Sequence, residues 1–175
     1  MKGEALASGA EHADNVAPSI LGGFTLVQSY EPLRVVKLQY PEDLVATIVH
    51  PHVEVKTADS KRILRQSIPL KKAITQWANV GGLVAGLAQE DFELIGHSLQ
   101  DVVAEPTRSM LIPMYEQVKI LSKELGALGC SISGSGPSIF MFSDAMNIAQ
   151  SLAESLKDLY MDNLISCDVY LSKIN

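Results

Sequence analysis

A short polar loop between two apolar stretches is the first feature of this sequence that could bind a ligand. Residues 129–142 read GCSISGSGPSIFMF, and the bulky apolar residues at both ends of this segment predict two strands. The loop between them contains Ser133, Gly134, Ser135 and Gly136. Glycine permits a positive φ, so that successive N–H groups can point together and bind an anion. Alternatively the segment is an ordinary hairpin loop, because a GxG pattern by itself has little specificity.

A second polar segment lies near the start of the chain. His12, Asp14 and Asn15 precede Pro18 and a strand-like segment, Phe24–Tyr30. An imidazole, a carboxylate and an amide can hold a polar ligand from several directions at once. The alternative is that Asp14 and Asn15 hydrogen-bond the backbone of their own loop, as these residue types often do.

Arg108 is the third candidate for ligand binding. It lies between Pro106 and Pro113, in a segment that breaks the helical pattern and that we interpret as a rigid apolar loop. A guanidinium held in this way can bind a carboxylate through two parallel N–H bonds. The alternative is a salt bridge from Arg108 to Glu105 or to another acid.

Histidine and cysteine give no indication of a metal centre. His50 and His52 flank Pro51 beyond a predicted strand, with no third ligand nearby, so we interpret both as solvated. Cys130 and Cys167 lie in strand-like apolar contexts, which favours buried reduced thiols. No cysteine–histidine spacing is typical of zinc binding.

The composition limits the class of protein. The chain has 175 residues, 47% of them hydrophobic, and a mean hydropathy of +0.15, which predicts one domain with a well-filled core. Its net charge of −6 argues against nucleic acid or an anionic membrane as partner. No apolar run has the length of a membrane span, and no leader-type segment is present in this sequence. We therefore expect a cytoplasmic protein.

The candidate residues must be positioned by a mixture of helices and strands. A helix is expected from residue 70, with one apolar face that includes Trp77 and lies in the core; shorter helices follow. Residues 41–43 are expected to form the turn between two successive strands. The architecture that follows is α+β, an antiparallel sheet of about five strands with helices packed on one face. The expected strands are residues 24–30, 33–40, 44–49, two within 129–142, and 164–171.

Two of these segments together resemble a known family. HADNVAPSILGGF, followed about a hundred residues later by GCSISGSGPS, resembles the carboxy-terminal part of the homoserine kinases, within the GHMP small-molecule kinase superfamily. The resemblance runs over essentially the whole chain. It implies a ferredoxin-like carboxy-terminal domain. It also implies ATP-dependent, Mg²⁺-assisted phosphorylation of L-homoserine to O-phospho-L-homoserine, a step of threonine biosynthesis.

The phosphate loop of that superfamily is absent from this sequence. A PxxxGLGSSA-type segment holds the ATP phosphates at a helix N-terminus, and here neither Gly22-Gly23 nor Gly81-Gly82 is followed by Ser-Ser-Ala. Residues 1–7 also read as the end of a helix with no capping residue before it. We therefore expect a fragment that lacks the amino-terminal ATP-binding domain. Residues 1–23 would be the end of that domain and the substrate loop, and residues 24–175 the carboxy-terminal domain.

The resemblance also assigns roles to single residues. Glu4 matches the carboxylate that helps to hold Mg²⁺. His12 and Asn15 match positions that contact homoserine, and Arg108 matches the arginine that grips the substrate carboxylate. The loop residues Ser133, Gly134, Ser135 and Gly136 match the superfamily's third motif.

One position departs from the family pattern. Thr57 matches a substrate-binding threonine, but the arginine expected four residues later is replaced by Lys61, with Arg62 next to it. Lysine cannot form the planar fork that grips a carboxylate. Either Lys61 acts as a point charge or Arg62 turns toward the substrate.

Two other functions stay open at this point. Another GHMP kinase, acting on mevalonate or a sugar, would keep the SGSGPS loop but should lose HADNVAP and Arg108. A non-catalytic binding or regulatory module would keep only this half of the fold, as the missing phosphate loop suggests for the isolated chain. We also expect self-association, because removing a domain uncovers apolar surface.

Overall fold

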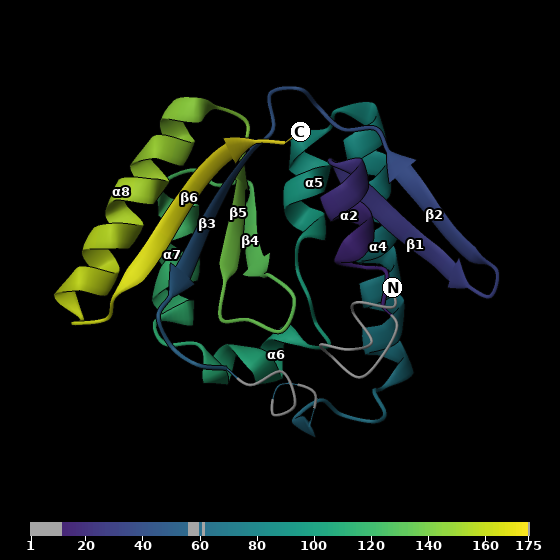
Figure 1. The fold of residues 1–175 in the computed structure, drawn as a ribbon, viewed down its shortest axis with the longest axis horizontal. Helices are drawn as coiled ribbons and strands as arrows, with labels where there is room; N and C mark the ends of the chain where they lie inside the picture. Colours follow the sequence, from purple (N-terminus) through teal and green to yellow (C-terminus); the bar gives the residue numbers. More distant parts are fainter. Residues whose placement is uncertain (1–11, 56–59, 61, 175) are drawn as a thin grey trace.

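A four-stranded antiparallel sheet forms the centre of the molecule (Figure 1). The computed structural model describes residues 12–55, 60 and 62–174. The strand order is β4-β5-β3-β6, and every neighbouring pair is antiparallel. The bounds of the strands are β3 Val45–Pro51, β4 Gly129–Ile132, β5 Ile139–Ser143 and β6 Cys167–Lys173.

One face of this sheet is sealed by two helices, α7 (Tyr115–Glu124) and α8 (Met146–Asp162). Alternate residues of β3 point to the same side, so Val45, Thr47 and Val49 are all buried. Leu152 and Leu156 of α8, which are fully buried, lie in one cluster with Val49, and Thr47 Oγ1 donates to the Ala149 carbonyl of α8 at 3.3 Å. This cluster is the main hydrophobic core.

The opposite face is covered in part by α4 (Leu70–Gln89) and α5 (Phe92–Ser98). Leu87 of α4 and Ile95 of α5 contact Phe142 of β5 within a second, smaller cluster. Asp91 caps α5 by accepting a hydrogen bond from the Leu94 N–H, a common device at helix N-termini. The predicted α+β class is confirmed, but the predicted placement of the helices on one face is wrong, because both faces of the sheet carry apolar side chains that helices cover.

The first two strands lie outside this sheet. β1 (Phe24–Tyr30) and β2 (Leu33–Leu38) form a separate antiparallel hairpin that follows α2 (Val16–Leu21). The predicted turn at residues 41–43 is confirmed, and the Leu44 N–H donates to the Pro41 carbonyl across it at 3.2 Å. Because β2 and β3 belong to different sheets, these residues connect the hairpin to the main sheet.

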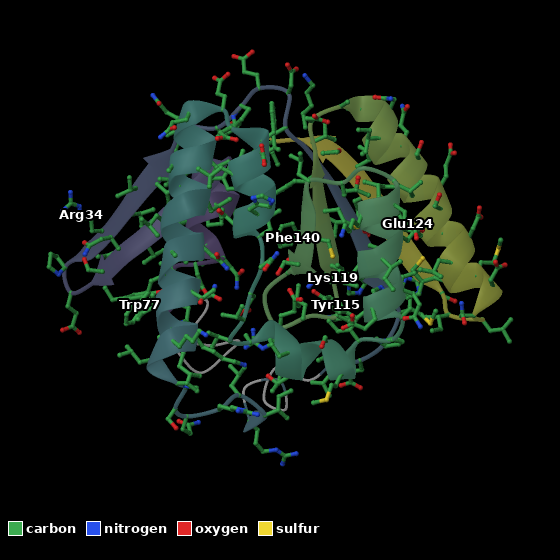
Figure 2. All side chains as sticks on the ribbon, turned by 180° about the vertical axis from the view of Figure 1, so that it is seen from behind. Arg34, Trp77, Tyr115, Lys119, Glu124 and Phe140 are labelled. Carbon is green, nitrogen blue, oxygen red and sulfur yellow. The ribbon has the colours of Figure 1, made fainter. Side chains whose placement is uncertain are left out.

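The apolar stripe of α4 is exposed. Trp77, which we expected in the core, has 64% of its surface accessible and projects from α4 on the outside of the molecule (Figure 2). Leu70, Ile74 and Val80 are exposed beside it. The periodicity correctly places these residues on one face, but within the described part of the chain nothing covers that face.

Among the described residues, every helix is either too short or too polar to span a bilayer.

Candidate functional site

The loop between β4 and β5, residues 133–138, is held in a tight turn by its own backbone. The Ser133 N–H donates to the Ser138 carbonyl at 2.8 Å, and the Gly136 N–H donates to the Ser133 carbonyl at 3.0 Å. Gly136 has φ +82°, and a Cβ there would lie 2.9 Å from Ile112 Cδ1, so the position requires glycine. The predicted strand–loop–strand arrangement is confirmed.

Two adjacent N–H groups of this loop are available to a ligand. Gly134 has φ +59° and is exposed. Within the part of the chain that the structure describes, the N–H groups of Gly134 and Ser135 have no acceptor. Adjacent backbone donors of this kind can bind an anion such as a phosphate or a carboxylate.

Three side chains from distant segments fasten this loop. Arg108 Nη1 donates to the Gly134 carbonyl at 3.0 Å, and Ser60 Oγ donates to the Ser135 carbonyl at 3.0 Å. His50 Nδ1 lies 2.8 Å from Ser138 Oγ. The interpretation of His50 as solvated is therefore wrong. The contributions of His50 and Ser60 were not recognisable in the sequence, because they lie far along the chain from the loop.

Arg108 ends a short helix instead of lying in a loop. Helix α6 spans Glu105–Arg108 and continues into a 3₁₀ turn, η1 (Ser109–Leu111). The alternative salt bridge to Glu105 is not found, since Glu105 pairs with Lys119. Arg108 Nε is buried and has no partner within the described residues. A ligand carboxylate would meet the guanidinium at its other N–H donors, since of these nitrogens only Nη1 has a hydrogen-bond partner among the described residues.

His12 and Asn15 lie at the start of α2. The His12 ring is half-buried, with its centroid 6.5 Å from the ring of Tyr30. Asn15 is exposed and begins α2, yet its side chain does not cap the helix. In the ranges described, no hydrogen bond joins the side chains of Asp14 and Asn15 to their own loop, and none joins His12 or Asn15 to Arg108. The contact of these residues with a substrate therefore stays a prediction.

The remaining assigned residues are only partly visible. Glu4, Thr57 and Lys61 lie outside the described residues. Arg62 is exposed and follows the buried Ser60, which binds the loop. The structure thus brings Ser60, Arg108 and the glycine loop to one place.

The described residues do not form a metal site by themselves. No group of three His, Cys, Asp or Glu side chains among them could hold a metal ion. Mg²⁺ is usually bound by one or two carboxylates together with substrate phosphates. Glu4, the assigned ligand, lies outside the described residues.

The two cysteines are free, as the sequence predicts. Burial raises the pKa of the Cys130 thiol to about 12, and burial also raises the pKa of the neighbouring Tyr115. A thiol with such a pKa stays protonated near neutral pH, so Cys130 is no candidate nucleophile. Its role is packing in the main core.

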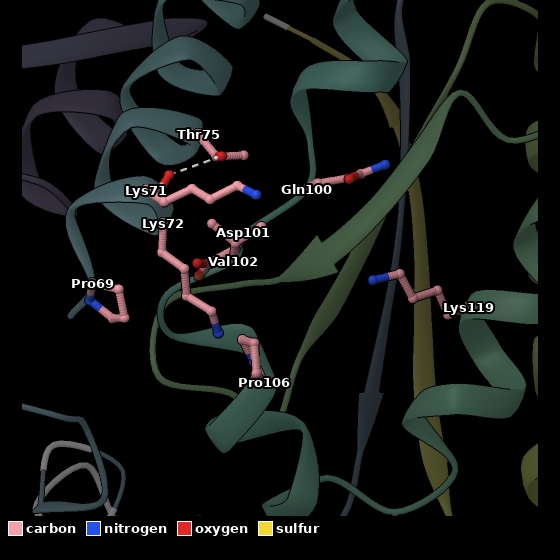
Figure 3. Close-up of a pocket in the computed structure, with 9 residues that line it drawn as sticks. All are labelled: Pro69, Lys71, Lys72, Thr75, Gln100, Asp101, Val102, Pro106 and Lys119. Atoms are coloured by element: carbon pink, nitrogen blue, oxygen red, sulfur yellow. Dashed lines mark hydrogen bonds between the residues drawn. The ribbon is translucent and has the colours of Figure 1, made fainter.

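A hollow of about 750 Å³ lies beside α6, between the start of α4 and α7 (Figure 3). Lys71 and Lys119 reach into it from opposite sides, and Asp101 and Pro106 form part of its wall. None of the assigned site residues that the structure describes lines this hollow. We therefore place the candidate site at Arg108 and the glycine loop, where the unpaired donors are.

Comparison with known proteins agrees with the arrangement of these elements. Residues 83–158 match the family model "GHMP kinases C terminal". The homoserine kinase of Chlorobium phaeobacteroides is 47% identical over 176 aligned residues, which cover 99% of this chain and 55% of the relative. The homoserine kinase of Thermococcus gammatolerans is 40% identical over 174 aligned residues, which cover 99% of this chain and 58% of the relative. The chain thus spans about half the length of the curated relatives it matches.

Solved structures give the same result. A crystal structure of homoserine kinase from Cytophaga hutchinsonii superimposes with a TM-score of 0.97 and 55% identity, covering 100% of this chain and 56% of that chain. L. major mevalonate kinase has a TM-score of 0.72 at 14% identity, covers 99% of this chain and 56% of that chain, and shows the shared fold alone. Residues 83–158 of the chain thus match the carboxy-terminal domain of the GHMP kinases, and the chain is similar along its whole length to the corresponding half of homoserine kinases.

Proposed function

We propose that the full-length protein transfers a phosphoryl group from ATP to the side-chain hydroxyl of L-homoserine. The products are ADP and O-phospho-L-homoserine, the hydroxyl proton leaving to solvent. This chain supplies the substrate side of the site, with residues 24–175 as the carboxy-terminal domain and residues 1–23 as the end of the preceding domain and the substrate loop. ATP would supply the transferred phosphoryl group, and Mg²⁺ would neutralise its negative charge.

The observation that carries the proposal is the state of Arg108. Its Nη1 is fixed on the Gly134 carbonyl, while its Nε is buried and has no partner among the residues that the structure describes. An amino-acid carboxylate placed there would accept the remaining guanidinium hydrogen bonds. The relatives that align along this whole chain are homoserine kinases, which supports homoserine as that amino acid.

The other residues of this chain would orient the substrate. His12 and Asn15 present an imidazole and an amide that does not cap α2, groups suited to the polar groups of homoserine. The N–H groups of Gly134 and Ser135, which have no acceptor within the described ranges, would contact an anionic group. Positioning and electrostatic stabilisation are sufficient for phosphoryl transfer in general, so the proposal assigns no general base.

The test is the kinetics of the full-length protein. Hydrogen bonds to charged groups contribute about 1.5–3 kcal/mol, and tenfold in affinity corresponds to about 1.4 kcal/mol. Arg108→Ala should therefore raise the KM for homoserine by roughly one to two powers of ten and leave the KM for ATP unchanged. Arg108→Lys should recover only part of this loss, for want of the planar fork.

An ADP-coupled assay with homoserine, and with other small alcohols as controls, gives these constants. Preference for a different alcohol would reject the substrate assignment. The chain as given, without a phosphate-binding loop, should show no homoserine-dependent ADP production, and robust turnover by it would contradict the proposal.

The same proposal includes the cellular location of the protein and its partners. We place it in the cytoplasm, with no nucleic acid or membrane as partner. Self-association of this chain is expected through exposed apolar residues such as Ile74 and Trp77. Light scattering at high concentration tests this expectation, and a strictly monomeric chain would contradict it.

A further inference from the structure

Helix α6 is too short to keep its own position. It contains only the four residues Glu105–Arg108, and a single helical turn is not stable by itself in water. Its last residue is Arg108, which we propose binds the carboxylate of the substrate. The position of the guanidinium therefore depends on what attaches α6 to the rest of the fold.

Glu105 attaches α6 to two other elements. Its side chain is 9% exposed, Oε1 forms an ion pair with Lys119 Nζ of α7, and Oε2 accepts a hydrogen bond from Ser131 Oγ of β4 at 3.4 Å. Lys119 and Tyr115 lie on the side of α7 that faces the sheet (Figure 2). A buried carboxylate is costly unless it is paired, so these contacts strongly favour one placement of α6.

Two further attachments lie just before α6: the Val102 N–H donates to Gln76 Oε1 of α4 at 3.0 Å, and Asp101 makes local bonds. Asp101 Oδ1 accepts from the N–H groups of Val103 and Ala104 at 2.7 and 2.9 Å, and Oδ2 accepts from the Glu105 N–H at 3.2 Å. The bonds of Asp101 shape the chain just before the helix. They connect α6 to no other element, which leaves Glu105 as the link to α7 and β4.

Glu105 and Arg108 contact the same strand and the loop that follows it. Residues three apart lie on one side of a helix. Glu105 meets Ser131 and Arg108 meets Gly134, and both contacts span a sequence separation of 26 residues. The helix thus lies along the end of β4 with one attachment at each of its ends.

We propose that Glu105 is a positioning residue: through Lys119 and Ser131 it sets the placement of α6, and thereby holds the Arg108 guanidinium where it meets the homoserine carboxylate. This inference rests on the proposed function. It assigns no contact between Glu105 and the substrate.

The first experiment compares charge-neutral variants of the full-length protein. Because a misplacement of about 1 Å can cost up to about 100-fold, Glu105→Gln should raise the KM for homoserine roughly tenfold, with the KM for ATP unchanged. Lys119→Met should act in the same direction. Lys123→Met, at an exposed lysine one turn further along α7, is the matched control and should leave both constants unchanged.

A double-mutant cycle separates positioning from general stability. If Glu105 acts through Arg108, Glu105→Gln should have no further effect on the homoserine KM once Arg108 is alanine. Independent, multiplying effects would overturn the inference. So would a lowered melting temperature with an unchanged homoserine KM, since that is what a purely structural carboxylate would give.

A second measurement does not depend on activity. The N–H groups of Thr107 and Arg108 bond to the Ala104 carbonyl at 3.1 and 3.0 Å, so their hydrogen exchange reports on α6. Glu105→Gln should accelerate it, and unchanged exchange would overturn the inference. If Arg108→Ala leaves homoserine kinetics intact while exchange still responds, the proposed function fails and the attachment stands. Should Glu105→Gln not fold, Ser131→Ala removes one hydrogen bond only and should give smaller shifts in the same directions.

Discussion

The two halves of the described molecule differ in how completely they bury their apolar residues. Between the four-stranded sheet and helices α7 and α8, Leu152, Leu156 and Tyr160 have no exposed surface. On α4, and on the β1–β2 hairpin that it contacts, Trp77, Leu70 and Leu33 stay accessible. The first half buries its apolar side chains within itself. The second half leaves apolar side chains exposed, as is typical of a surface that binds a partner.

The largest effect should come from a cavity in the sealed half. Leu156→Ala removes a fully buried side chain of α8, which typically costs about 2–5 kcal/mol. Trp77→Ala, although it removes a larger side chain, should change the free energy of unfolding by no more than about 0.5 kcal/mol in this chain. Urea denaturation measures both, and a larger loss at Trp77 would reverse the comparison.

Two glycines of α4 give a finer comparison within one helix. A Cβ at Gly86 would lie 2.9 Å from the Ile95 backbone nitrogen, so Gly86→Ala should cost about 1–3 kcal/mol by overpacking the contact with α5. A Cβ at Gly81 meets nothing within 4 Å. Gly81→Ala should therefore stabilise the helix by about 0.5–1 kcal/mol. Equal effects of the two substitutions, seen by thermal denaturation, would contradict the assignment of the faces of α4.

Alkaline pH should weaken the sealed half specifically. Burial raises the pKa of Cys130 and of Tyr160 to about 12, against ordinary values of about 8.5 and 10. A raised pKa contributes stability that is fully present below the unfolded value and is lost as the pH rises through the folded value. The melting temperature should thus fall progressively above about pH 8.5, and less steeply in Cys130→Ala. A melting temperature that stays constant up to about pH 12 would contradict this prediction.

The smallest effect is expected at the edge of the main sheet. His52 Nε2 and Asp168 Oδ2 lie 2.9 Å apart with both side chains about half exposed, and the hydrogen bond from His52 holds the pKa of Asp168 below its ordinary value. Exposed pairs contribute little because solvent screens them. Asp168→Asn should leave the denaturation midpoint near neutral pH unchanged within error. A clear loss would show that this edge matters more than burial suggests.

Local patterns of the sequence predict local structure well here. The strand–loop–strand segment at residues 129–142 follows from alternating apolar residues and two glycines, which act over a few positions. The sheet to which β2 and β3 belong does not follow, because pairing depends on residues about a hundred positions away. Likewise, periodicity shows that Trp77 shares a face with Ile74, but it carries no information on what covers that face.

The candidate site shows the same limit. Arg108 could be singled out by its residue type and its neighbouring prolines, and the glycine loop by its composition. His50 could not, since its partner Ser138 is 88 residues away. Nor could Glu105 be separated from the other acids, because its importance arises from a lysine on α7 and a serine on β4.

The position of β3 in the sheet has a consequence for biosynthesis. This strand lies between β5 and β6, both made long after it; His52, just beyond its end, meets a partner 116 residues further on. At about 5–20 residues per second on the ribosome, the strand would wait roughly 6–23 s for that partner to be synthesised. During this interval its apolar residues, Val45 and Val49 among them, have no sheet to join. The nascent chain thus exposes an aggregation-prone strand, and we expect its yield in cells to depend on chaperones that bind extended apolar segments.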